Sequence, residues 1–529
     1  NTATQEGGGV FCFNSDPSFM NVTISGNVSD IADGGGMFIK SNSSVNLVNT
    51  ILWGNGSDEL EFSSVDDPST ITLLYSNIES GQDSIITNNN GTVTWSDGNI
   101  DSDPMFVDTA NGNYHLLASS QLINAGHPDS LDSDGTVADM GAYPYLNSYS
   151  GPTWYITESG NDTTGTGASN DPFRSIQSGI NFSSDADSVT VAAGTYVENI
   201  NFRGRNIKMA GADQETTIID GNQAGSVVVF ENGETSSALL SGFTIQNGSG
   251  RPSSSPGYAD GGGIYCLFSS PSLISLTIKN NTASWGGGIY CSSSNPTLED
   301  IEISNNTVNV DGGGLNINDQ SSPLLINVNI FNNSASGTGG GIKFEGGSIS
   351  YLTNTIIHNN SQSFTSYSGT AHFNQCTIAN NDNNAYLGGG TALSFTNSLL
   401  IERALDSDDG NITIDVSYSA FAGGDSTFNV NLSPTWNNLI YPEGDGGLVD
   451  TANGDYHLLA DSRLIDAGHP DSTDADGTIA DIGAFYYDQA GQPVRVSNLI
   501  TTPSAENVSV KWKANSDAAS YNIYRSTDV

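Results

Sequence analysis

The stretch at residues 261–282 reads GGGIYCLFSSPSLISLTIKNNT, and residues 286–307 read GGGIYCSSSNPTLEDIEISNNT. In both, a glycine triplet precedes a short apolar strand, a polar turn with proline, a second alternating strand and an asparagine pair. Self-similarity at a fixed period of about 20–50 residues indicates a repeat fold. Within each run the triplets are spaced 25–27 residues apart, and they begin at Gly7, Gly34, Gly261, Gly286, Gly312, Gly339 and, about two periods further, Gly388.

Two or three short strands per period, with no helical pattern between them, predict one coil of β-strands per repeat. A single coil cannot bury its apolar face alone, so successive coils are expected to stack into an all-β solenoid. Side chains alternate between the two faces of a strand. This alternation directs Ile264 and Cys266 inward in one coil, and Ile301 and Ile303 inward in the next.

Asparagine at the same corner of every coil predicts a ladder, because its side-chain amide can bond to the backbone at the bend. We expect this ladder at Asn247, Asn280, Asn305, Asn332, Asn359 and Asn380. The glycines are expected at corners that need unusual backbone angles. Cys266 and Cys291 occupy the same point of adjacent coils, about 4.8 Å apart. They are interpreted as two small buried hydrophobes, with a disulfide as the alternative.

This pattern resembles the right-handed parallel β-helix of pectate-lyase-like proteins, in which asparagine ladders are well known. Leucine-rich repeats would show a denser leucine grid, and calcium-binding nonapeptide arrays would show a nine-residue period. The resemblance implies tandem right-handed parallel β-helix solenoids with a coil period of about 25 residues.

A second, longer repeat divides the chain into modules. Residues 107–143 and 449–485 are identical at 28 of 37 positions, with a constant offset of 342. We call these two stretches the first and second closing segments. They predict that residues 1–146 are the C-terminal part of a first β-helix module, that 147–490 are a complete second module, and that 491–529 form a third region.

The second module opens with the sequence TWYITESGND from residue 153 and DPFRSIQSGI from residue 171. This opening resembles that of many bacterial secreted β-helix proteins, which implies export and a cap helix at about 173–182 over the open end of the core. The second closing segment resembles the choice-of-anchor region of anchored β-helix proteins. Residues 508–525 resemble the early strands of a fibronectin type III β-sandwich, which needs roughly 100 residues, so we expect the natural chain to continue.

The charge of the chain excludes several partners. It has 529 residues, with 14 Lys plus Arg against 58 Asp plus Glu, for a net charge of −44. Nucleic acids and anionic membranes require a basic face, so neither is expected as a partner. No apolar run approaches the roughly 18–20 residues of a transmembrane segment. This composition suits a β-rich extracellular protein more than a cytosolic helical one.

Each closing segment carries an acidic loop with the core pattern D-x-D-G-T-x-x-D. Carboxylates at alternate positions around a glycine turn can wrap a hard cation, which suggests one structural Ca²⁺ site per module. The bidentate glutamate of an EF-hand is missing. The alternative is an Asx-turn loop whose carboxylates cap backbone N–H groups. The candidate ligands are Asp129, Asp132, Asp134 and Asp139 in the first module, and Asp471, Asp474, Asp476 and Asp481 in the second.

The insertion at residues 248–260 interrupts the coil spacing. Arg251, Tyr258 and Trp285 are candidates for a sugar-stacking patch beside it, and a disordered loop is the alternative. Asp260 and Asp311 both precede glycine triplets, but Trp285 interrupts their row, unlike the carboxylate row of a pectinase. No Ser-His-Asp, zinc or lyase pattern is recognised, so we assign no catalytic residue and do not favour an enzyme.

Tandem β-helices would form a long, stiff rod. We therefore expect a secreted or cell-surface structural and adhesive protein, which is part of a longer tandem-repeat chain. Its expected partners are a polysaccharide, a cell-surface glycan or copies of itself. The alternative is a polysaccharide-degrading lyase or hydrolase on the same fold, for which the fold alone is weak evidence.

Overall fold

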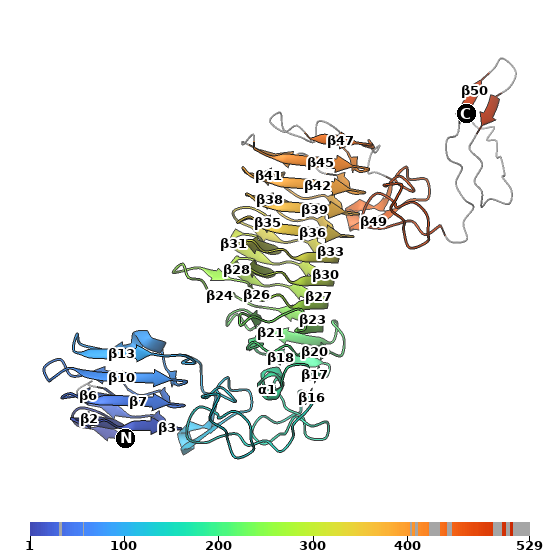
Figure 1. Ribbon diagram of the computed structural model, residues 1–529. Helices are drawn as coiled ribbons and strands as arrows, with labels where there is room; N and C mark the ends of the chain where they lie inside the picture. The colour runs from blue at the N-terminus through green and yellow to red at the C-terminus, as the bar shows by residue number, and fades with distance from the viewer. Residues whose placement is uncertain are drawn as a thin grey trace.

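The structure is a computed structural model. It describes residues 1–30, 34–56, 58–401, 405–407, 411–422, 434–441 and 447–489, and the backbone of 500–503 and 508–511. Nearly all of the regular structure is β-strand, and the strands form two stacks joined by irregular segments (Figure 1). Each stack is a β-solenoid, because its strands pair in parallel with strands one coil further along the chain.

The first solenoid has three parallel sheets. The first sheet contains β2 (Val10–Phe13), β6 (Met37–Lys40), β9 (Leu60–Phe62) and β12 (Ile85–Ile86). The second contains β3 (Ser18–Met20), β7 (Ser44–Val48), β10 (Ser69–Leu74) and β13 (Gly91–Trp95). The third contains β4 (Thr23–Ser25), β8 (Ile51–Trp53) and β11 (Asn77–Ile78). A separate pair consists of β1 (Thr2–Ala3) and β5 (Val28–Ser29).

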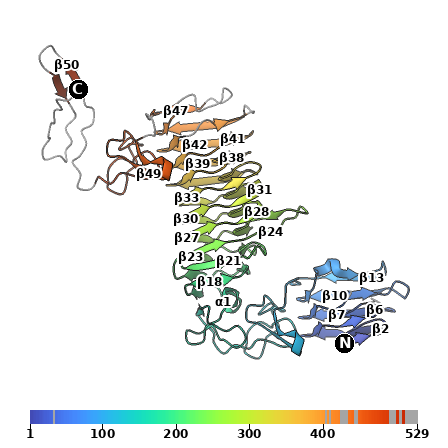
Figure 2. The ribbon, with the colours of Figure 1, turned by 180° about the vertical axis from the view of Figure 1, so that it is seen from behind.

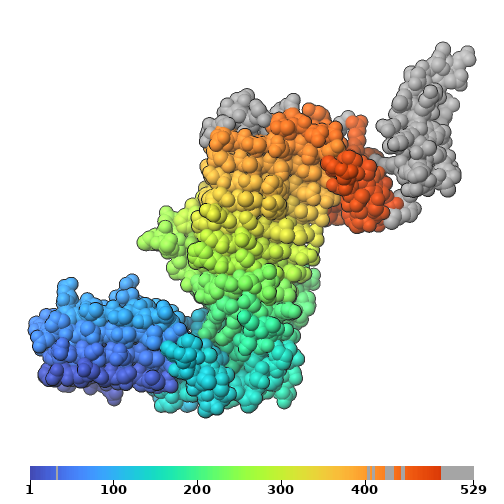
Figure 3. All heavy atoms as spheres, in the orientation of Figure 1, coloured from blue at the N-terminus to red at the C-terminus, as the bar shows by residue number. Residues whose placement is uncertain are grey.

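The second solenoid is longer and also has three sheets. One contains β19 (Ile200–Asn201), β22 (Val228–Phe230), β26 (Ile264–Leu267), β29 (Ile289–Ser292), β32 (Leu315–Asn318), β35 (Ile342–Phe344), β38 (Phe364–Ser366), β41 (Ala385–Leu387) and β44 (Leu405–Asp406). A smaller one contains β24 (Arg251–Pro252), β25 (Ala259–Asp260), β28 (Thr282–Trp285), β31 (Thr307–Asp311) and β34 (Ser334–Ala335). The hairpin of β24 and β25 stands out from the flank (Figures 1 and 3).

The third sheet of the second solenoid runs along its whole length. Its first strands are β16 (Thr153–Ile156), β17 (Ser188–Val191), β18 (Gly194–Val197), β20 (Lys208–Gly211), β21 (Thr217–Asp220), β23 (Leu239–Gln246), β27 (Ser272–Lys279), β30 (Thr297–Ser304) and β33 (Leu324–Phe331). It continues with β36 (Ile349–Thr353), β37 (Ile356–His358), β39 (Thr370–Asn374), β40 (Thr377–Ala379), β42 (Ala392–Thr396), β43 (Leu399–Ile401), β45 (Thr413–Ser417), β46 (Ala420–Phe421) and β47 (Thr435–Asn437).

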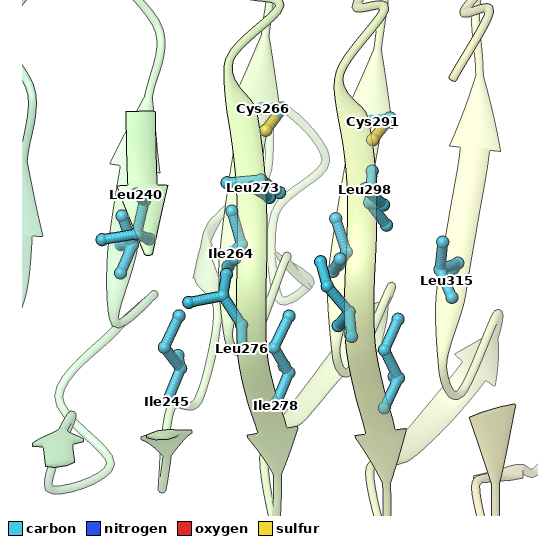
Figure 4. Packing of buried hydrophobic residues seen from close by; sticks show 14 of the residues in the cluster. Leu240, Ile245, Ile264, Cys266, Leu273, Leu276, Ile278, Cys291, Leu298 and Leu315 are labelled. Atoms are coloured by element: carbon cyan, nitrogen blue, oxygen red, sulfur yellow. The ribbon is translucent and has the colours of Figure 1, made fainter. Parts of the chain in front are cut away.

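The core consists of side-chain rows that run along the solenoid. Ile264 pairs in register with Ile289, and Ile289 with Leu315, and all three are fully buried. Each buried aliphatic side chain of this size contributes about 1.5–3 kcal/mol. Figure 4 shows further members of these rows: Leu240, Leu273, Leu298, Leu276 and Ile278. The inward alternation expected from the sequence is therefore observed.

Cys266 and Cys291 form one step of such a row. They pair in register, are 0% and 1% exposed, and carry free thiols. A hydrogen bond with Cys291 and burial raise the pKa of the Cys266 thiol well above its usual value. The two cysteines therefore behave as small neutral core residues.

The predicted asparagine ladder is wrong by one residue. The predicted residues all have left-handed backbone angles, with φ between 52° and 58°, and they form the corner itself: Asn247, Asn280, Asn305, Asn332, Asn359 and Asn380. Asparagine tolerates this conformation better than most residues. The corner turns the side chain of the following residue into the solenoid, and that residue forms the ladder.

The observed ladder consists of the second asparagine of each pair. Asn281 is buried, accepts a bond from the Gly248 N–H, and donates from Nδ2 to Asn306 Oδ1 at 3.1 Å. Its Nδ2 also donates to the Ile245 carbonyl of the preceding coil. The same bonds continue through Asn306, Asn333, Asn360 and Asn381. Burying an amide with its bonds satisfied avoids a desolvation penalty of about 1–3 kcal/mol at each step.

The glycine triplets allow adjacent coils to approach closely. Gly261 has φ +62°, the left-handed region expected for a corner glycine. A Cβ atom at Gly262 would lie 2.5 Å from the Gly287 carbonyl oxygen, so a side chain there would collide with the next coil. The triplet at Gly388 is not equivalent, because it follows β41, a strand of the sheet that contains β26, whereas the Gly261 triplet precedes β26. The interval before it is therefore not two regular periods.

The two solenoids meet through the first closing segment. It contains β14 (Phe106–Asp108), the 3₁₀-helix η2 (Thr109–Asn111) and β15 (Asn113–Leu116). It lies between the first solenoid and α1 (Ile176–Phe182), which is the expected cap helix and is buried along its length (Figure 2).

The second closing segment lies on the flank of the last coils (Figure 3). It contains β48 (Leu448–Asp450), η4 (Thr451–Asn453) and β49 (Asp455–Leu458). Beyond it, β50 (Ile500–Pro503) and β51 (Val508–Lys511) form an antiparallel pair. The rest of the predicted fibronectin-like region lies outside the described residues.

Candidate functional site

The acidic loops were predicted as metal sites, and their carboxylates are engaged by the backbone. Asp134 Oδ1 accepts from the Thr136 N–H and hydroxyl, and its Oδ2 accepts from the Asn147 N–H at 2.8 Å. Asp132 Oδ2 accepts from the Asp139 N–H at 2.9 Å. The carboxylates thus close the loop on itself.

The buried acid of this loop is Asp139, which is 3% exposed. Its two oxygens accept from the Asn124 and Tyr145 N–H groups at 2.7 and 2.6 Å. Burial raises the pKa of Asp139 to about 7. For Asp134 the backbone and side-chain hydrogen bonds outweigh burial, so its pKa is lowered.

The second loop repeats these bonds through Asp474, Asp476 and Asp481. Asp129 and Asp471 are exposed, and each donates its N–H to the preceding histidine. Among the described residues, no three His, Cys, Asp or Glu side chains converge as a metal site. The geometry therefore favours the Asx-turn alternative, and Ca²⁺ binding stays a prediction.

The aromatic residues beside the 248–260 insertion do come together. Tyr258, at the end of the protruding hairpin, lies 4.8 Å from Trp285, measured between ring centroids. Tyr258 is 44% exposed and borders a hollow of about 490 Å³ over β28 and β31. A partly exposed aromatic pair offers a flat apolar surface with polar tips, which suits a sugar ring.

Arg251, the third predicted residue, lies close by but has other partners. Its Nη1 is 2.8 Å from Glu231 Oε1, and its guanidinium lies 5.9 Å from the centroid of Tyr265. Tyr265 stacks on Tyr290 of the next coil, with centroids 5.6 Å apart and an interplanar angle of 7°. The two residues pair in register on adjacent strands, where Tyr265 is 9% exposed and Tyr290 is partly exposed. We call Tyr258, Trp285, Tyr265 and Tyr290 the aromatic strip.

Polar groups continue the strip along the same sheet. Asn316 and Lys343 follow Tyr290 in register on β32 and β35. Lys343 forms ion pairs with Asp311 and Glu345. Burial opposes its charge, but the hydrogen bonds and negative charges of these two acids outweigh burial and raise the pKa of Lys343.

Two buried polar groups at the strip lack partners. The Asn316 side chain is fully buried, and neither its Oδ1 nor its Nδ2 has a hydrogen-bond partner. Asp260 is 6% exposed, and its Oδ1 also has no partner. Burial raises the pKa of Asp260, and its charge in turn contributes to a raised pKa of Tyr265 and of Tyr290. A buried polar atom without a partner is uncommon in folded proteins, and a bound water or strain in the fold accounts for such atoms.

The sequence analysis did not identify Tyr265 and Tyr290 of the aromatic strip, nor the neighbouring charged residues Lys343 and Glu231. Tyr265, Tyr290 and Lys343 are assigned to strand positions by the repeat, but their neighbours depend on which residues of successive coils pair. A register read from Gly261 to Gly286 would have aligned Tyr265 with Tyr290. Glu231 precedes the repeat run and gave no signal.

One comparison with known protein families supports the fold of the second solenoid. A family model described as a right handed beta helix region matches residues 227–400. The fold class predicted from the sequence, a right-handed parallel β-helix with a period near 25, is therefore confirmed for the solenoid. A search of curated proteins finds no match. The described residues contain no helix with the length and apolarity needed to cross a bilayer.

Solved structures that align with this chain include pectate lyase Pel9A, at 14% identity and a TM-score of 0.43, over 63% of this chain and 96% of that chain. Others are a pectin methylesterase from carrot, at 13% identity and a TM-score of 0.30, over 56% and 90%, and pectin methylesterase PemA from Erwinia chrysanthemi, at 12% and 0.25, over 54% and 81%. At these identities and TM-scores they carry no argument about activity.

Proposed function

We propose that the protein is a secreted or cell-surface structural and adhesive rod whose aromatic strip binds a neutral polysaccharide. The observation that carries the proposal is the aromatic strip, which consists of the pair Tyr258 and Trp285 and the stacked pair Tyr265 and Tyr290. The solenoid supports these rings on paired strands, which holds them in a fixed geometry before a ligand binds.

The charges of the strip favour a neutral glycan over an acidic one. The two cations beside the aromatic strip are paired with carboxylates: Arg251 with Glu231, and Lys343 with Asp311 and Glu345. The net charge of −44 repels an anionic polymer over a distance of about one Debye length.

The test is affinity electrophoresis of the full chain in gels that contain neutral or acidic polysaccharides. We expect retardation by at least one neutral polymer and none by the acidic ones. The double variant Tyr258→Ala/Trp285→Ala should weaken that retardation at least tenfold. The matched control is Tyr351→Ala, which removes an equally exposed ring that stacks on His372 at 4.9 Å on another sheet. Equal retardation of wild type and the double variant would contradict the proposal.

A second candidate, hydrolysis of the bound glycan, rests on one observation. Asp260 and Asp311 pair in register with Trp285 from the coils on either side of it, so their backbones are about 10 Å apart. Inverting glycosidases use two carboxyl groups about 6.5–9.5 Å apart, one protonated and one ionised. Asp260 is buried with a raised pKa, whereas Asp311 forms an ion pair with Lys343. Shortened polysaccharide after incubation would support hydrolysis, and intact polysaccharide would exclude it for that polymer.

A further inference from the structure

Each closing segment has an inner face that packs on its own solenoid, and the contacts of one histidine on this face are the same in both copies. In the first, Asn49 Oδ1 accepts from the His127 N–H at 2.7 Å. In the second, Asn397 Oδ1 accepts from the His469 N–H at 2.6 Å. The histidine rings also pack alike, because each meets a tyrosine edge at centroid distances of 5.0 and 4.6 Å. We call this shared contact of His127 or His469 with its own solenoid the clasp.

The outer face of the first closing segment, residues 117–124, contacts the capped end of the second solenoid. Asn181 of α1 donates from Nδ2 to the carbonyl oxygens of Ala118 and Ser120 at 2.9 and 2.7 Å. Asn124 donates from its Nδ2 to the Asn181 carbonyl at 3.1 Å. Ala118 is fully buried at this contact, whereas its counterpart Ala460 is exposed; Ser120 and its counterpart Ser462 are buried in both copies.

A cation of the first coils completes this joint. Arg203 donates from Nη1 to the Ile123 carbonyl at 2.9 Å and to Asn181 Oδ1 at 2.7 Å. The carboxylate of Asp139, in the acidic loop of the same closing segment, is close enough to offset the charge of Arg203. Directional hydrogen bonds thus connect the first closing segment to α1 and to Arg203 in the first coils of the second solenoid.

The outer face of the second closing segment, residues 459–466, has a different surface. The three positions that correspond to Ser119, Gln121 and Asn124 carry charged residues: Asp461, Arg463 and Asp466. Ala460, Asp461 and Arg463 are exposed, whereas Ala118 and Ser119 are buried.

These three substitutions work against a buried contact. A carboxylate at position 466 has no N–H to donate, so it cannot form the bond that Asn124 gives to Asn181. Burying the exposed carboxylate of Asp461 against a cap would remove its hydration, which is costly for a charged group. Three of the nine differences between the two closing segments fall on this face.

We propose that the outer face of a closing segment selects the neighbour of its module. The first face accepts the capped end of another β-helix, and the second face rejects such an end. The partner of the first face is thus defined by its chemistry: a buried asparagine on a short cap helix, and an arginine from the coil beneath it. The order of modules along the rod is encoded at three surface positions. This inference is independent of glycan binding.

The test uses the full chain with Ser119→Asp/Gln121→Arg/Asn124→Asp, which transfers the second face onto the first. Amide hydrogen exchange of peptides that cover α1 should become at least tenfold faster, while peptides from β26, β29 and β32 remain unchanged. The matched control is Leu131→Thr/Val137→Ile, which transfers other second-copy residues. Asn113→Asp adds a charge control, because the Asn113 side chain bonds to His115 within its own strand.

Unchanged exchange at α1 in the triple variant would overturn the proposal. Equal acceleration in the controls would also overturn it, because the effect would then not be specific to the face. Should the triple variant fail to fold, Asn124→Asp alone decides the question in the same way, since it removes a single donor from the joint.

Discussion

The two closing segments have nearly the same sequence but different surroundings. They share 28 of 37 residues, and one histidine of each makes the same backbone bond to its own solenoid. Their outer faces differ, because Ala118 is fully buried against the next cap whereas Ala460 is exposed. The comparison shows that attachment to a module and choice of a neighbour are separate properties. They are carried by different residues of the same segment.

The largest expected effect comes from the shared clasp. Asn49→Gly and Asn397→Gly each remove the side-chain oxygen that accepts the histidine N–H, and glycine tolerates the positive φ of both positions. Each variant should lose about 2 kcal/mol, because a buried N–H is left without a partner. Chemical denaturation of the two variants measures this loss. A loss in one copy only would show that the clasp is not the same in both.

A smaller effect separates the two copies by pH. His358 is 6% exposed, stacks on Phe331 and meets the edge of Tyr456 in the second closing segment, both at 5.0 Å. Burial lowers the pKa of His358 to about 4 from an ordinary value of 6.5. The unfolded state therefore binds the proton first, and stability that is complete above pH 6.5 is lost as the pH falls towards 4.

We expect protonation of His358 to cost the second closing segment about 1–2 kcal/mol between pH 7 and pH 4.5. Burial raises the pKa of Asp481 in the same segment to about 6, so its protonation acts in the opposite direction. Tyr114, which corresponds to Tyr456, packs on Phe106 instead of a histidine. The first segment should not share this loss. Hydrogen exchange of peptides from both segments at the two pH values is the measurement, and His358→Phe should abolish the difference. A pH response that survives in that variant would assign it to another group.

The fold was predictable because the repeat appears in every coil. Glycine triplets, alternating strands and asparagine pairs each limit the chain to the same solenoid, so the evidence accumulates with each repeat. The ladder was misplaced by one residue because the sequence shows two adjacent asparagines and no sign of which one has the positive φ. The Gly388 triplet was misread because a motif can recur at a different corner when the coil length changes.

The candidate site was only partly predictable. Tyr258 and Trp285 were found as an aromatic pair near a loop, which needed no knowledge of register. Arg251 was predicted beside them, but its observed partners are Glu231 and the ring of Tyr265, and these depend on contacts between coils. The acidic loops illustrate the limit of a motif, because the same spacing of carboxylates serves a cation or the backbone N–H groups of the loop. Only the geometry distinguishes these uses.

The smallest expected effect concerns these loops. Asp132 and Asp134 accept backbone N–H bonds, and Asp474 and Asp476 repeat the arrangement. We therefore expect thermal melts in excess Ca²⁺ and in excess chelator to overlay within about 1 °C. A chelator-dependent fall in melting temperature would instead support the calcium site that the sequence suggested.

The most direct test of the comparison is amide hydrogen exchange in the unmodified protein at pH 7. The Ala118 N–H donates to the Asp162 carbonyl across the joint at 2.8 Å, in a segment held on both faces. Residues 460–465 are the corresponding stretch of the second closing segment, and their outer face is exposed. The account predicts that amides at 118–123 exchange at least tenfold more slowly than those at 460–465. Equal exchange rates in the two segments would contradict it.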